Sequence, residues 1–181
     1  MYQDKSLVST EAVRLAALGR LAAGAMTYAD LAQDIRHFVT RIVGPSLDLL
    51  GSSLEILRLE GLIAPAEGSS VADDTEMVIT ESGRQDFLDL MDASLRAPLD
   101  DTGRLVMALK LRFLFEVPKE QQLDQIDLLR ELAQSELARL EALQQSHAEG
   151  ALAGSLALDI DQVNARIAWL NDLEAQLENA A

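Results

Sequence analysis

Several side chains between residues 28 and 53 could contact anions such as phosphate. Arg36, His37 and Arg41 are spaced so that a helix would present them as a small basic face. Four hydroxyl groups in the same stretch could donate hydrogen bonds to phosphate oxygens or contact base edges, namely those of Tyr28, Ser46, Ser52 and Ser53. The alternative is that Arg36 and Arg41 form ordinary surface ion pairs with Asp34 and Asp48.

The residues needed for catalysis or metal binding do not occur in recognisable patterns. The two histidines, His37 and His147, are far apart, and the sequence contains no cysteine. It also has no H-E-x-x-H motif, no glycine-rich phosphate loop and no G-x-S-x-G motif. We therefore expect neither an enzyme nor a bound metal or cofactor.

The charge balance is strongly acidic. The 181 residues include 30 acids and 15 bases, which gives a formal net charge of −15. This argues against generic attraction to nucleic acid or to anionic lipid. The negative charge is uneven, because residues 1–63 have a net charge of −1, whereas residues 64–95 and residues 96–181 each have −7.

The first half of the chain predicts three helices followed by a β-hairpin. Apolar residues recur at helical spacing over residues 10–23, from Thr27 to Gly44, and from Leu47 to Leu57. Thr27 can act as the N-cap of the second of these helices. Two short β-prone runs, 62–64 and 77–79, then flank a polar stretch. A fourth helix is predicted to start after Thr80 as its N-cap. This order is typical of a winged helix-turn-helix domain, which we assign to residues 1–97.

The second half of the chain predicts long helices. The predicted helices are residues 102–117, residues 119–147 and a last helix that follows Gly150 and Gly154. Pro118 separates the first helix from the second, and the two glycines separate the second from the last. Two long helices joined by a short turn form an antiparallel hairpin that leaves apolar surface uncovered, so we expect residues 98–181 to form a helical dimerisation domain. The residues expected at the dimer interface are Leu105, Leu109, Phe113, Ile160, Val163, Ile167 and Leu170.

Two motifs give a more specific indication. The run from Ser53 to Ile63 reads S-L-E-I-L-R-L-E-G-L-I, and Ile79 to Arg84 reads I-T-E-S-G-R. These resemble the end of the recognition helix and the start of the following helix in PadR-type winged-helix transcriptional regulators. The helical second half resembles the longer branch of that family. One departure is Glu55, because the family often has Arg or Lys at the two positions after the matched Leu54.

The resemblance implies a mainly helical homodimer that binds a double-stranded operator, acts as a repressor and responds to an effector. It implies DNA contacts by the winged helix, for which the candidates are Tyr28, Arg36, Arg41, Ser46, Ser52 and Ser53. The acids Asp73, Asp74 and Glu76 lie in the predicted wing and would repel phosphate.

Two other readings stay open. One is a winged-helix adaptor that no longer binds DNA and holds a protein through its acidic surface. The other is a sensor in which Trp169 stacks on a small aromatic effector, although a tryptophan on a helix stripe is more often a packing residue. With no signal-peptide pattern and no apolar run of about 20 residues, a cytoplasmic location without membrane contact is expected.

Overall fold

The computed structural model describes residues 7–44, 50–66 and 75–179, with only the backbone described for residues 50–53. The chain separates into two compact units. The first unit consists of the residues up to Ser94 together with Leu99–Pro118. The second unit consists of Leu95–Pro98 and the residues from Lys119 onward. Within the described ranges, every helix is too short or too polar to span a bilayer.

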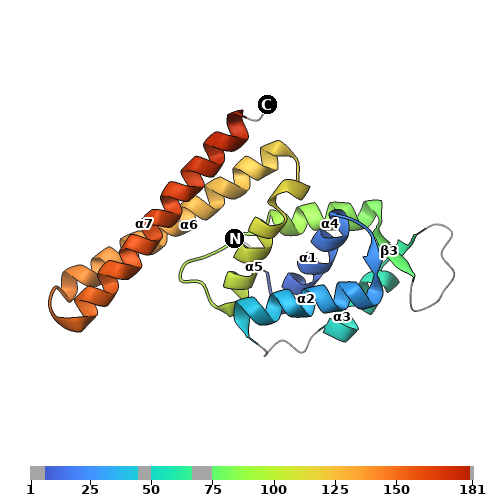
Figure 1. Cartoon of the computed structure of the whole chain (residues 1–181), viewed down its shortest axis with the longest axis horizontal. Coiled ribbons are helices and arrows are strands. Elements are labelled where there is room, and N and C mark those ends of the chain that lie inside the picture. The colour runs from blue at the N-terminus through green and yellow to red at the C-terminus, as the bar shows by residue number, and fades with distance from the viewer. Residues whose placement is uncertain (1–6, 45–49, 67–74, 180–181) are drawn as a thin grey trace, which may run out of the picture. The chain divides into compact units, whose positions relative to one another are not determined.

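The first unit is built from short helices and a small sheet (Figure 1). Its elements are α1 (Ser9–Ala22), β1 (Met26–Thr27), α2 (Tyr28–Val43), α3 (Leu50–Leu59), β2 (Ile63–Pro65), β3 (Glu76–Ile79), α4 (Glu81–Met91), α5 (Asp101–Arg112) and the 3-10 turn η1 (Leu114–Glu116). This is the element order of a winged helix-turn-helix domain, so the predicted fold class is confirmed.

Side-chain capping fixes where two of these helices begin. The Thr27 hydroxyl accepts a hydrogen bond from the Asp30 amide at 3.1 Å, at the start of α2. The Thr80 hydroxyl accepts one from the Gly83 amide at 3.1 Å, at the start of α4. Both residues were predicted as N-caps, because a threonine oxygen satisfies an amide that has no partner inside the helix.

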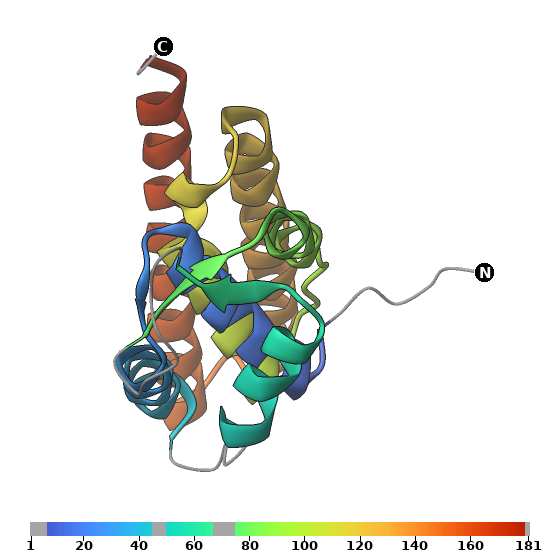
Figure 2. The same ribbon diagram turned by 90° about the vertical axis from the view of Figure 1, so that its right-hand side faces the viewer.

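The sheet has the strand order β1-β3-β2, and both pairings are antiparallel. The predicted hairpin is β2 with β3, in which Ile63 pairs with Ile79 and Pro65 with Met77. Strand β1 was not predicted, because two residues are too few to show a strand period. Figure 2 shows β2 and β3 crossing in front of α1. Eight residues of α1 are buried, so this helix is the centre of the unit.

Helix α5 completes the core of the first unit. The Phe113 ring meets the Phe87 ring edge to face, with centroids 6.3 Å apart. It also lies against Gly19 of α1, where an added Cβ would come within 2.4 Å of the ring. The Arg112 guanidinium lies 4.6 Å from the Phe38 ring centroid and donates to Asp34 of α2 at 2.8 Å.

These contacts differ from the sequence-based assignment of residues 98–181 to one helical domain. Leu105, Leu109 and Phe113 are buried within the first unit. The sequence predicts a boundary at Pro98. The structure instead packs α5 on α1 and α2, and Lys110 of α5 contacts Met91 of α4, so residues far apart in the sequence join in one core. The burial of these three residues needs no second copy of the chain.

The second unit is an antiparallel hairpin of α6 (Lys119–Ser146) and α7 (Gly150–Asn179) (Figure 1). Ala133, Leu140, Leu156 and Val163 form its buried core, with Ile160 and Ile167 packed against them. Arg130 of α6 forms an ion pair with Glu174 of α7. Gly150 has a positive φ of 86° at the turn, whereas Gly154 lies inside α7, so only Gly150 contributes to the predicted break.

Candidate nucleic-acid interface

Helices α2 and α3 are the two helices of the helix-turn-helix. Leu54 and Leu57 are buried and fix the inner side of α3. The opposite side carries Ile56 and Leu59, which are 47% and 74% exposed. The described part of α3 therefore presents an outward face that mixes apolar and charged side chains.

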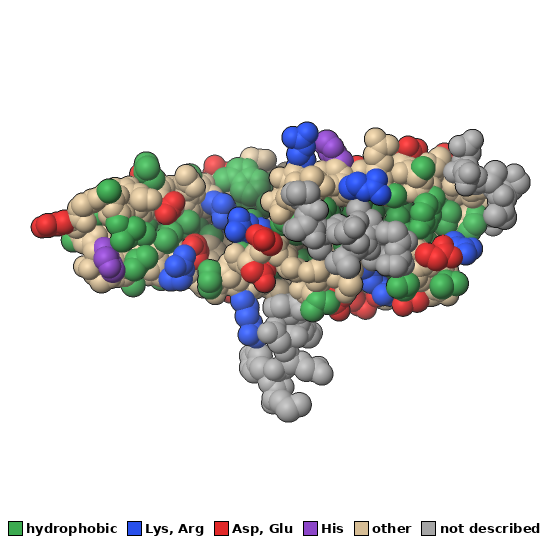
Figure 3. Space-filling model, turned by 90° about the horizontal axis from the view of Figure 1, so that it is seen from below, with side chains coloured by type: hydrophobic (Ala, Val, Ile, Leu, Met, Phe, Trp, Pro, Cys, Tyr) green, Lys and Arg blue, Asp and Glu red, His purple; other side chains and the backbone are tan. Residues whose placement is uncertain are grey.

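Arg36 and Arg41 lie on the exposed side of α2, opposite the buried Leu31, Ile35 and Val39. Together with the exposed His37, they form what we call the α2 cationic face. Figure 3 shows lysine or arginine side chains (blue) beside a histidine (purple) at the upper edge of the view.

The acid proposed to neutralise this face has another partner. The Asp34 carboxylate accepts both of its hydrogen bonds from Arg112, at 2.8 and 2.9 Å. Asp48 lies outside the described residues. Among the residues that are described, neither Arg36 nor Arg41 forms an ion pair, so the α2 cationic face has two charges available for an anion.

Tyr28, the first residue of α2, is half-buried beside two charged residues of α3. Its pKa is raised by burial and by the nearby Glu55 carboxylate, and Arg58 partly offsets this effect. The phenol therefore stays protonated and can donate a hydrogen bond.

Glu55 and Arg58 form an ion pair on α3 that sequence reasoning missed. Arg58 Nε donates to Glu55 Oε2 at 3.2 Å, and Nη2 donates to Oε1 at 2.5 Å. These hydrogen bonds lower the pKa of Glu55, which stays ionised at neutral pH. The i, i+3 spacing of Glu55 and Arg58 is the sequence signal that indicates this pair.

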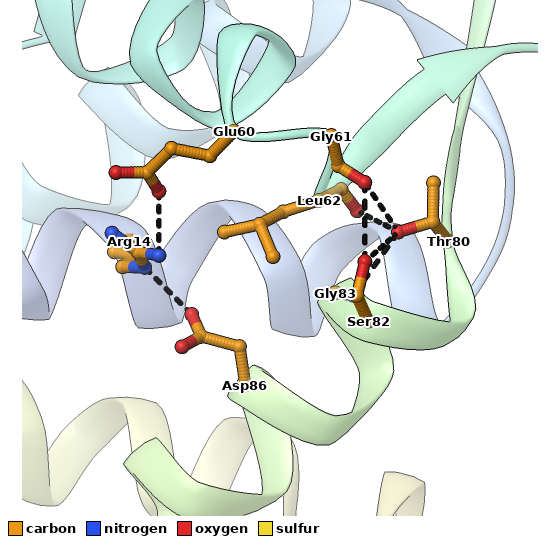
Figure 4. A network of polar contacts seen from close by, with 8 residues as sticks. All are labelled: Arg14, Glu60, Gly61, Leu62, Thr80, Ser82, Gly83 and Asp86. Atoms are coloured by element: carbon orange, nitrogen blue, oxygen red, sulfur yellow. Dashed lines mark hydrogen bonds and ion pairs between the residues drawn. The ribbon is translucent and has the colours of Figure 1, made fainter.

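A polar network holds the end of α3 against α1 and α4 (Figure 4). Arg14 of α1 forms ion pairs of 2.6 Å with Glu60 and with Asp86. The Thr80 hydroxyl contacts the carbonyl oxygens of Gly61 at 2.8 Å and Leu62 at 3.0 Å. This network positions α3 relative to the rest of the unit.

Gly83 allows α4 to approach β2 closely in this network. A Cβ at this position would lie 2.0 Å from the Leu62 carbonyl oxygen, which real side chains never do. The I-T-E-S-G-R motif therefore has a physical role. Its threonine caps α4 and binds the turn after α3, and its glycine gives the room for that contact.

The predicted DNA contacts also include three serines whose side chains the structure does not describe. Ser46 lies outside the described residues, and Ser52 and Ser53 are in α3 with their side chains not described. In the wing, Glu76 is exposed on β3, whereas Asp73 and Asp74 lie outside the described residues. DNA contact by these serines, as by Tyr28, Arg36 and Arg41, remains a prediction.

The predicted interface and effector residues of the second unit lie on different sides of α7. Val163 and Leu170 are buried, and Ile160 and Ile167 are half-buried against the hairpin core. Trp169 is 49% exposed. Leu158 lies eleven residues before Trp169, on the same face of α7, and is 65% exposed.

Comparison with solved structures finds PadR regulators. Bacillus subtilis PadR in complex with p-coumaric acid matches with 16% identity and a TM-score of 0.40, over 96% of this chain and 99% of that chain. The same protein in complex with operator DNA matches with 16% identity and a TM-score of 0.38, over 91% and 98%. A PadR-like regulator from Bacillus cereus matches with 18% identity and a TM-score of 0.40, over 93% and 99%.

None of the curated proteins matches the chain. A family model does match, over residues 2–174, and its description is "Putative AphA-like transcriptional regulator". The predicted resemblance to PadR-type regulators is confirmed. Since the family model covers nearly the whole sequence, the chain belongs to the AphA-like family of transcriptional regulators.

Proposed function

We propose that this regulator binds double-stranded operator DNA as a homodimer and represses transcription. The observation that carries DNA binding is the α2 cationic face, on which Arg36 and Arg41 are exposed and have no ion-pair partner among the described residues. Unpaired cations on the helix next to α3 suit phosphate contacts, which position a helix-turn-helix on the duplex. Tyr28 and the three serines would add neutral hydrogen bonds.

The experiment for DNA binding compares charge variants of the full chain on duplex DNA at several salt concentrations. Arg41→Ala should weaken binding and reduce the magnitude of the salt slope by about 0.9 for each protomer, or about 1.8 for a homodimer that loses one phosphate contact per half-site. The matched control is Arg139→Ala in α6, which removes the same charge from an exposed pair in the second unit. An unchanged slope for Arg41→Ala would remove this residue from the interface, and no binding by the wild type would end the proposal.

The dimer would be joined through the second unit. Leu158 and Trp169 are large apolar residues exposed on one face of α7, and a second copy could cover them. Ile160, Val163, Ile167 and Leu170 would support this interface from within the hairpin, because they fix α7 on α6. Leu105, Leu109 and Phe113 are not part of this proposal.

Sedimentation tests the dimer. Leu158→Asp should shift the protein toward monomers while the helix content stays the same, because the exposed side chain supports no core. Glu141→Gln at an exposed site of α6 should leave the sedimentation unchanged. A full dimer with Leu158→Asp would place the interface elsewhere.

Trp169 also supports a response to a small aromatic effector, because its exposed surface could stack on an effector that binds in a pocket between the two copies of the chain. Quenching of its fluorescence by a hydroxycinnamic acid such as p-coumaric acid would support this role. The chain has one tryptophan, so the signal is specific.

The adaptor is the second candidate, and the outward apolar residues of α3 favour it. Ile56 and Leu59 are exposed in a chain with a net charge of −15, which would suit a partially basic, partially apolar protein surface. The two candidates separate in the salt titration, because an adaptor would bind no duplex even at low salt.

A further inference from the structure

The Glu55–Arg58 pair has a geometry that leaves one edge of the arginine free. A guanidinium has a side edge formed by Nε and Nη2 and an end edge formed by Nη1 and Nη2. Glu55 accepts from Nε at 3.2 Å and from Nη2 at 2.5 Å, so it occupies the side edge. No other described residue accepts a hydrogen bond from Arg58, so Nη1 and the second hydrogen of Nη2 remain for an acceptor outside this pair.

The free edge suits a guanine base. Two parallel N–H groups of an arginine match the O6 and N7 acceptors that guanine presents in the major groove. Both side chains are about half exposed, Arg58 at 51% and Glu55 at 46%, so an approaching base could reach them. The carboxylate fixes the plane of the guanidinium before the base arrives, which reduces the entropy lost on binding.

The charge of the pair also points to a base and away from a phosphate. The carboxylate of Glu55 cancels the cation of Arg58, so together they add little to the attraction toward the DNA backbone. The α2 cationic face, with Arg36 and Arg41, has no such compensation among the described residues. The net positive charge of the α2 cationic face therefore suits phosphate contacts, and the neutral pair on α3 suits a base contact.

The location of the pair distinguishes it from an ordinary surface ion pair. Arg139 and Glu136 on α6 have nearly the same geometry, with Nε donating at 3.0 Å and Nη2 at 2.5 Å. That pair lies on the α6–α7 hairpin, whereas Glu55 and Arg58 lie on the second helix of the helix-turn-helix. Tyr28 at the start of α2 lies close enough to interact electrostatically with both residues of the α3 pair.

We propose that Arg58, held by Glu55, reads a guanine in the major groove of each operator half-site. This inference rests on the proposed DNA binding and adds a specificity-determining residue to it. In this arrangement Glu55, which departs from the family's usual basic residue, is a positioning residue for Arg58.

The experiment begins with selection of bound duplexes from a random pool by the full-length wild-type chain, followed by affinity measurements on single-base variants. Arg58→Ala should reduce the preference for one G·C pair per half-site by about 10-fold to 100-fold, the range expected for a bidentate arginine–guanine contact. Because Arg58→Ala leaves the Glu55 carboxylate unpaired, all duplexes should also bind somewhat more weakly, but the salt slope should stay near the wild-type value, since no phosphate contact is lost. Replacing that guanine by 7-deazaguanine, which lacks the N7 acceptor, should weaken the wild type and leave Arg58→Ala unaffected.

Glu55→Gln gives a readout that a structural role would not produce. It removes a negative charge from the DNA-facing side, so binding to random-sequence duplex should become tighter, while preference for the guanine should fall. Glu136→Gln and Arg139→Ala should change neither quantity. Thermal melts of each variant check folding, which should be unaffected because both side chains are exposed.

Each other outcome has a definite meaning. If Arg58→Ala keeps the guanine preference, or weakens all duplexes equally with a smaller salt slope, the base-reading role is wrong while DNA binding stands. If the wild type selects no duplex at low salt, the DNA-binding proposal fails, and the inference that rests on it fails too.

Discussion

The two units bury their apolar residues in different ways. In the first unit, α5 closes a core with residues from α1, α2 and α4, through Phe113, Phe87 and the Arg112 contact to Asp34. In the second unit, two consecutive helices bury one stripe each. Leu152, Leu158 and Trp169 remain exposed on α7.

This difference indicates what each unit can do alone. The first unit has the long-range contacts of a self-sufficient domain, so its folding should depend on single core positions. The second unit has fewer such contacts and an exposed apolar face, so its stability should depend more on helix propensity and on a partner. The following predictions test that contrast.

The largest expected effect is in the core of the first unit. Phe113→Ala should lower its free energy of unfolding by about 3–5 kcal/mol, because the ring fills the space beside Gly19 and Phe87. The single tryptophan, Trp169, lies in the second unit, so its fluorescence follows that unit alone, while circular dichroism follows both.

In a urea titration of Phe113→Ala, circular dichroism should show an earlier transition, and the midpoint from Trp169 fluorescence should stay near the wild-type value. A second large-to-small change, Leu156→Ala in the hairpin core, should move the fluorescence midpoint instead. If Phe113→Ala moves both signals equally, the two units unfold as one and the contrast between them is wrong.

The sequence predicts the local features of this molecule better than the long-range ones. The caps Thr27 and Thr80 and the β2–β3 hairpin were predicted, because each depends on residues within a few positions. The place of α5 was not, because it depends on Arg112 meeting Asp34, which is 78 residues away.

The candidate site also has a part that local sequence predicts and a part that depends on long-range contacts. The exposure of Arg36 and Arg41 follows from helical periodicity, and the structure places both on the outer side of α2. Their lack of an ion-pair partner among the described residues depends on Asp34 being held by Arg112, a tertiary contact that no local pattern contains. Periodicity gives the face of a helix, and tertiary packing decides which charges on that face are neutralised.

The second prediction concerns the buried Lys110 of α5. Its ammonium group donates to the carbonyl oxygen of Met91 at the end of α4. Burial lowers the pKa of Lys110 from 10.5 to about 8, although the Asp92 carboxylate partly opposes this. The unfolded chain therefore binds more protons than the folded chain between pH 8 and 10.5, and stability should rise with pH in that window.

This rise should reach about 2 kcal/mol between pH 8 and pH 10. It is measured as the difference in free energy of unfolding between the wild type and Lys110→Met, because other groups titrate in both proteins. The comparison should show the rise in the wild type only. An equal pH dependence in the two proteins would mean that Lys110 is not the group responsible. Burial of the Lys110 ammonium group would then cost the folded protein no stability.

The smallest effects come from one substitution made in both units. Gly83→Ala should destabilise the first unit by about 1–3 kcal/mol, because the new Cβ would meet the Leu62 carbonyl oxygen and a backbone atom cannot move aside easily. Gly154→Ala has no atom within 4 Å of the new Cβ and lies inside α7. It should stabilise the second unit by about 0.5–1 kcal/mol, since glycine is a poor helix former.

The free energy of unfolding should fall for Gly83→Ala and rise for Gly154→Ala, and this difference in sign separates the two units most clearly. A tightly packed unit has no room for one methyl group, whereas a hairpin with an open face gains from the helix propensity of alanine. Urea midpoints from circular dichroism for Gly83→Ala and from Trp169 fluorescence for Gly154→Ala give both values. Destabilisation by Gly154→Ala would mean that the open face at Gly154 is covered in solution, and its dependence on protein concentration would show whether a second copy of the chain covers it.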